Sequence, residues 1–247
     1  MHRRPLQIMM PPVSDTPAER LDGFSGRYRS AGRRASITCL LLGVVAFFAL
    51  VSMIQAGSGL RVVDDVRAGM LIPKEAKDFH DSTVFAGLEY LGAALATAIA
   101  YLAWLSRTVD NVPELRGGRP SVTPRWSIGW WFIPLANLVK PYQIVRDIHD
   151  RLAIGAGPGG GWIVLAWWVT SILGNVISQI ATRLPDPSSP DALSTLYSIQ
   201  ATGYALALLG AILAIVVVLR IQWRADARAD SRGARPAGGP RWRQIPR

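Results

Sequence analysis

The sequence predicts an all-α integral membrane protein with four transmembrane helices in a compact bundle, and three observations support this fold class. Half of the 247 residues are hydrophobic. Three stretches carry no charged residue, and a fourth carries only Glu89; they are residues 35–60, 152–182, 192–219 and 82–106. Because about 20 apolar residues suffice for a helix to cross a bilayer, these stretches exclude a soluble globular protein. Cys39 is the only cysteine, which excludes a disulfide scaffold and a cysteine metal site.

The four spanning helices are expected at residues 36–56, 83–105, 162–182 and 199–219. Helix is the state that satisfies every backbone N–H and C=O group within its own segment in lipid. We expect an outer loop over residues 57–82 and a turn-rich hairpin loop over residues 183–198, where Pro185, Pro187 and Pro190 interrupt any helix. Small residues such as Gly203 and Gly210 predict close packing of the last helix.

Basic residues set the predicted orientation. Residues 1–35, 106–160 and 220–247 carry seven, seven and eight Lys or Arg, whereas residues 57–82 carry four and residues 183–198 carry one. Basic segments stay in the cytoplasm, so both termini are expected there. The membrane domain is then residues 36–222. Its flanks are a disordered basic tail (1–35) and a disordered arginine-rich tail (223–247), which has too few apolar residues to fold alone.

The uncharged run at residues 126–139 (WSIGWWFIPLANLV) does not fit four spans. It is too short for a comfortable crossing, and a fifth span would send the arginine-rich tail outside. We therefore expect a re-entrant or interfacial segment. Pro141 then suits the first turn of a helix over residues 141–153. The apolar stripe of this helix predicts an amphipathic helix on the cytoplasmic leaflet, and it consists of Ile144, Val145, Ile148 and Leu152.

Two polar sets within the spans are candidate intramembrane sites. Glu89 is the only ionisable residue in a predicted span, and it shares a helix face with Thr97 and Tyr101. The third span carries the polar stripe Ser171, Asn175, Ser178 and Gln179. One interpretation is that these sets form a proton, ion or solute pathway. The other is that Glu89 is a carboxyl near the outer interface and that the polar stripe forms hydrogen bonds between helices. We favour the second interpretation.

The candidate interaction segment is aromatic and proline-rich, and it comprises Trp126, Trp130, Trp131, Pro134, Asn137, Lys140, Pro141 and Tyr142. Tryptophan and tyrosine rings are common at membrane interfaces, and anchoring there is the simplest role for them. The alternative is a pocket for a lipid head group or a partner protein. Because the motif is compact and chemically unusual, any function is expected to centre on it.

Three groups of residues resemble a bacterial membrane family catalogued as domain of unknown function 4328. The groups are RTVDN (Arg107 to Asn111), residues 123–148 and the Trp167–Trp168 pair with Asn175. The resemblance extends over residues 36–222 and implies four helices, a tryptophan-rich segment ending in a Pro–Tyr pair, and a bacterial inner membrane. His149 stands where the family usually has tryptophan, and residues 57–82 form a longer loop than usual. The family has no assigned activity.

No pattern in the sequence predicts an enzyme. Residues 155–160 match G-x-G-x-x-G but lack a surrounding βαβ unit, and Asp147, His149 and Asp150 are too few for a metal site on one short helix. We expect no catalytic residue, metal or cofactor, and no nucleic-acid partner. The expected partners are anionic lipid head groups and an unidentified membrane protein, with the oligomeric state open. The first hypothesis is a non-enzymatic interaction module; the alternative is a small transporter or proton pathway.

Overall fold

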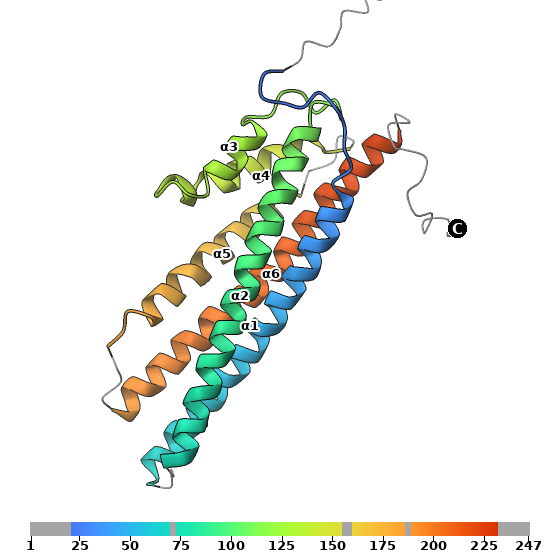
Figure 1. Cartoon of the computed structure of the whole chain (residues 1–247). Helices are drawn as coiled ribbons and strands as arrows, with labels where there is room; N and C mark the ends of the chain where they lie inside the picture. The colour runs from blue at the N-terminus through green and yellow to red at the C-terminus, as the bar shows by residue number, and fades with distance from the viewer. Residues whose placement is uncertain (1–20, 70–72, 155–159, 186–188, 232–247) are drawn as a thin grey trace, which may run out of the picture.

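The computed structural model describes residues 21–69, 73–154, 160–185 and 189–231, and the regular secondary structure in these ranges is helical. Four helices are long and apolar enough to cross a membrane: α1 (Gly32–Arg67), α2 (Pro73–Asn111), α5 (Trp162–Ala181) and α6 (Pro190–Asp230) (Figure 1). Between α2 and α5 lie α3 (Pro124–Gly129), the 3-10 turn η1 (Ala136–Leu138) and α4 (Lys140–Arg151). Some of the predictions concern residues that the structure does not describe, namely residues 1–20, 155–159 and 232–247 and Pro187.

Three of the four long helices, α1, α2 and α6, extend beyond the predicted spans, so the predicted loops are shorter, whereas α5 ends one residue before its predicted span does. Together α1 and α2 include most of residues 57–82, which were expected to form an outer loop. Pro190 was expected to interrupt a helix but stands in the first turn of α6. The Ser189 side chain caps this helix by accepting a hydrogen bond from the Ala192 N–H at 3.2 Å. Proline is tolerated there because a first-turn N–H has no partner within the helix.

The prediction that residues 223–247 are disordered is wrong for residues 223–230, which continue α6. Ala225 and Ala229 are buried on one face of this extension. Arg224 donates to the His149 carbonyl at 2.8 Å, and Arg228 donates to the Ala153 carbonyl at 2.7 Å. In this alternating sequence the alanines form a helix face with small side chains that packs into the core. The arginines between them have long side chains that reach neighbouring carbonyls. The segment is ordered by contacts that composition does not reveal.

The bundle is organised around α1 and α6. The most extensive helix contacts join α1 to α6, α5 to α6 and α1 to α2. Figure 1 shows these four long helices in one elongated bundle. The predicted close packing of α6 is confirmed at Gly203 and Gly210. A Cβ on these glycines would lie 3.2 Å and 3.4 Å from the hydroxyls of Ser178 and Ser171 on α5. Packing against α6 is therefore one role of the polar stripe on α5.

Most of the largest fully buried side chains gather at one end of the bundle, whereas Val63 on α1 is buried near the other end. The gathered side chains come from the last turns of α2 and the following loop, from α4 and from α6, and include Trp104, Leu105, Leu115, Ile148, Leu152 and Ile221. We call this region the α4 end. The apolar stripe of α4 was expected to face the leaflet, but Ile144, Val145, Ile148 and Leu152 are at most 1% exposed and belong to this core. The protein itself covers the stripe.

Glycine packing between α1 and α6 generates a first prediction. A Cβ on Gly59 would lie 2.8 Å from ring carbons of Tyr197, whereas a Cβ on Gly57 would meet nothing within 4 Å. Replacing a helical glycine by alanine otherwise stabilises by about 0.5–1 kcal/mol. We expect Gly57→Ala to raise the Tm of the detergent-solubilised protein and Gly59→Ala to lower it, each by about 2–4 °C. Equal shifts for the two variants would contradict this packing.

Candidate interaction surface at the α4 end

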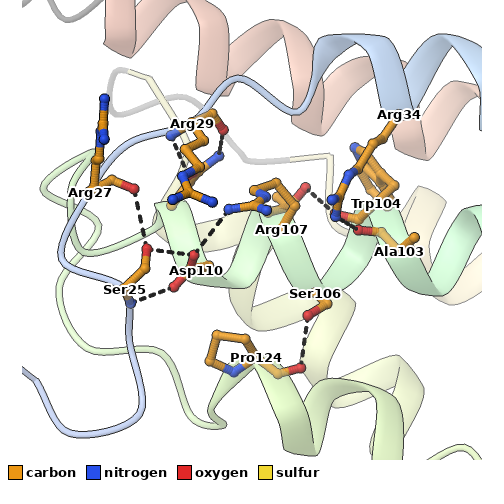
Figure 2. Close-up of polar contacts among 12 residues, drawn as sticks. Ser25, Arg27, Arg29, Arg34, Ala103, Trp104, Ser106, Arg107, Asp110 and Pro124 are labelled. Carbon is orange, nitrogen blue, oxygen red and sulfur yellow. Dashed lines mark hydrogen bonds and ion pairs between the residues drawn. The ribbon is translucent and has the colours of Figure 1, made fainter.

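The segment before α1 is fastened to the last turn of α2 (Figure 2). Ser25 donates to the Asp110 carboxylate through its N–H at 2.9 Å and its hydroxyl at 2.7 Å, and Arg107 lies 3.5 Å from the same carboxylate. Asn111 accepts from the Arg29 N–H at 3.2 Å and donates to the Arg29 carbonyl at 2.8 Å. The resemblance positions Arg107 and Asn111 therefore lie in a structural clamp. Asp110, which the sequence analysis did not single out, makes its central contacts.

The clamp predicts protection of the N-terminal segment from proteolysis. Removing the Asn111 side chain deletes both hydrogen bonds to Arg29, so the segment should open more often. We expect trypsin to cleave Asn111→Ala after Arg27 or Arg29 several-fold faster than the unmodified protein, as followed by mass spectrometry. Ser36→Ala is the control, because the Ser36 hydroxyl bonds only its own helix at Gly32. Cleavage at the unmodified rate in Asn111→Ala would rule out the clamp.

The tryptophan-rich segment begins at α3, which is attached to α2. Thr123 caps α3 by accepting from the Trp126 N–H, and Pro124 follows it in the first turn. The Ser106 hydroxyl on α2 donates to the Pro124 carbonyl at 3.1 Å (Figure 2). Buried Ser127 donates to the same carbonyl at 2.7 Å. These bonds fix where the segment leaves the bundle.

Aromatic packing holds the middle of the segment. The Trp131 ring meets Tyr101 on α2 at 5.6 Å and Trp168 on α5 at 5.9 Å between centroids, both edge to face. Trp167 lies 6.0 Å from Tyr101 and 5.5 Å from Trp168, and we call these four rings the aromatic cluster. Trp168 also donates from its indole N–H to the Leu138 carbonyl at 3.0 Å. Trp131 and Tyr101, predicted for different sites, are therefore brought together as framework.

The remaining residues of the candidate segment have different environments. Trp126 and Trp130 lie 5.3 Å apart between ring centroids, and the Lys140 ammonium stands 5.3 Å from the Trp130 ring. The Tyr142 hydroxyl accepts from Arg146 at 3.1 Å. Pro141 is buried, Asn137 is half-buried and Pro134 is exposed. The side of the segment that contacts the bundle is thus aromatic, through Trp131.

Its other side is an exposed apolar surface, which we call the apolar ridge and which consists of Phe132, Ile133, Leu135, Leu138 and Val139. Phe132 is 73% and Leu135 is 81% exposed. Leu135 adopts φ +65° and ψ −46°, which lie outside the allowed regions for a residue with a side chain and cost about 1–3 kcal/mol. Sequence reasoning missed Phe132 and Leu135: the uncharged run marked the segment, but only its turns decide which side chains point outward.

The predicted intramembrane polar residues do not form one site. Thr97 and Ser171 each donate to a carbonyl of their own helix, at 2.7 Å and 2.8 Å, so their hydroxyls are satisfied locally. Glu89 is exposed on α2, while Asn175 and Gln179 are exposed on α5. Within the described part of the chain, no hydrogen bond or ion pair joins Glu89 to α5.

His149 on α4 is fully buried beside charged neighbours. Its Nδ1 lies 3.0 Å from an Asp150 carboxylate oxygen, and its Nε2 has no partner among the described residues. Burial lowers the pKa of His149. The hydrogen bond and charge of Asp150 raise this pKa, whereas the positive charges of Arg224 and Arg220 lower it further. The carboxylate of Asp147 pairs with Arg151 at 2.6 Å.

The lowered pKa of His149 predicts acid sensitivity. Because the folded-state pKa lies below the unfolded value of 6.5, the unfolded chain takes up the proton first. The stability contribution is complete above about pH 6.5 and is lost as the pH falls toward the folded value. We expect the Tm of the unmodified protein to fall when the pH is lowered from 7.5 to 5.5, and the Tm of His149→Gln to fall less. A full drop in His149→Gln would refute the assignment.

The fold and this surface define a class: a small all-helical protein with four membrane-length helices and an aromatic segment packed beside one end of the bundle. The chain belongs to the family described as Domain of unknown function (DUF4328), whose family model matches residues 67–223. This confirms the resemblance, although the match begins at the end of α1 and not at residue 36. Neither the curated proteins nor the solved structures include a match to this chain.

Proposed function

We propose that the chain is a non-enzymatic interaction module of a bacterial cytoplasmic membrane and binds a partner membrane protein through the apolar ridge. The observation that carries this proposal is the position of Leu135. A strained backbone conformation, a side chain 81% exposed and an anchored framework on both sides occur together there. Local strain of this kind is found where a surface is held for contact.

The framework supports recognition because it presents the apolar ridge in one conformation. Ser106 holds the start of the segment, Trp168 holds the Leu138 carbonyl, and the aromatic cluster holds Trp131. Ordering a loop on binding costs free energy, and a preformed loop avoids that cost. An exposed phenylalanine in an uncharged apolar surface also fits the core of a protein interface, which is depleted in charged residues and enriched in aromatic ones.

The orientation in the proposal places both termini and the α4 end in the cytoplasm. It rests on the excess of Lys and Arg in residues 1–35, 106–160 and 220–247. In this orientation the apolar ridge lies near the inner membrane surface, where it is accessible to another membrane protein. The bacterial inner membrane follows from the family resemblance.

Site-specific photocrosslinking in cells tests the proposal. With a photoreactive amino acid at Leu138, we expect a discrete protein adduct, reduced about tenfold by Phe132→Ser with Leu135→Ser. Both side chains are exposed, so the double variant leaves the aromatic cluster intact. The matched control places the probe at Ile99, which is 72% exposed on α2 and should give lipid adducts. Lipid adducts alone at both positions would defeat the proposal of a protein partner.

A further inference from the structure

Two arginines stand against the backbone at the start of α5. A Cβ on Gly161 would lie 2.7 Å from the Arg146 Cζ, and a Cβ on Gly160 would lie 3.2 Å from the Arg220 Cζ. The guanidinium groups thus occupy the space beside consecutive glycines, and any side chain there would displace them. Gly160 also has φ +53°, which favours glycine. Arg146 comes from α4 and Arg220 from α6, so folding brings these charges together.

The positive charges of the arginines beside Gly160 and Gly161 are only partly compensated by a neighbouring carboxylate. Arg146 uses Nε on Asp150 at 2.8 Å and Nη1 on the Tyr142 hydroxyl at 3.1 Å. Its Nη2 lies beside Gly161 and donates no hydrogen bond within the described ranges. Arg220 has no ion-pair partner in these ranges. Arg224, one turn further along α6, directs its guanidinium to the His149 carbonyl and adds a third positive charge.

The start of α5 adds positive potential to this arginine pair. No side chain caps α5, and the Ile163 N–H donates to the Gly160 carbonyl at 3.1 Å, so the start of the helix contributes mainly the positive end of its dipole. Trp162, the first residue of α5, is 69% exposed. Exposed tryptophan at the end of a membrane helix is typical of head-group depth. Arg146 and Arg220 lie beside the two glycines that directly precede this tryptophan.

From this geometry we infer that Arg146 and Arg220, with the first turn of α5, bind the phosphodiester group of an anionic phospholipid. A guanidinium group presents parallel N–H donors that fit two phosphate oxygens. The Nη2 of Arg146 and both Nη atoms of Arg220 are the donors for this contact. This site is separate from the apolar ridge, so its test does not depend on the proposed partner protein.

The test is titration of the delipidated full-length protein in neutral detergent with dioleoyl phosphatidylglycerol, followed by native mass spectrometry. We expect saturable binding of one lipid, weakened about fivefold by Arg146→Gln or Arg220→Gln and more by the double variant. Gly161→Ala should also weaken it, because its Cβ displaces the Arg146 guanidinium without removing charge. Arg220→Lys should bind between Arg220→Gln and the unmodified protein. Arg33→Gln, an exposed arginine at the start of α1, is the matched control.

Three outcomes would overturn the inference. Equal binding of phosphatidylcholine would show that the charge of the lipid is not recognised. Displacement of the lipid by millimolar inorganic phosphate would identify a soluble anion as the ligand. Unchanged binding in Arg146→Gln, Arg220→Gln and Gly161→Ala, each with the Tm of the unmodified protein, would place the lipid elsewhere.

Discussion

Burial of the apolar stripe of α4 is the contact on which the α4 end depends. Ile144, Val145 and Ile148 are at most 1% exposed, although α4 is otherwise polar and short. Burying three such side chains contributes several kcal/mol, at about 1.5–3 kcal/mol each. That burial holds α4 against the bundle. It thereby places His149 in the core and Arg146 beside α5.

The same packing explains why α6 extends past the length that a membrane needs. Its last turns offer small residues to the core and direct Arg224 and Arg228 to carbonyls at the end of α4 and just beyond it. A carbonyl at a helix end lacks an intrahelical donor, so an arginine there satisfies it and complements the helix dipole. The extension and α4 therefore stabilise each other. Neither has enough apolar surface to fold alone.

Functionally, the α4 end presents two surfaces of opposite character on one rigid support. The apolar ridge is uncharged and projects from the aromatic cluster, whereas the arginine pair beside Gly160 and Gly161 is strongly positive. A lipid held by the arginines would stabilise α4, α5 and α6 relative to one another.

The sequence by itself determined that four helices are long and apolar enough to cross a membrane, because this follows from the length and charge of apolar runs, which are local properties. It also identified the family, which short groups of residues indicated. It also located the tryptophan-rich segment and the helix after it. Only the tertiary structure decided which side chains of that segment are framework and which are exposed. Trp131 and Tyr101 meet although 30 positions separate them, and Leu135 points outward because of a backbone turn. Contacts between distant residues fix these features, and local composition does not encode them.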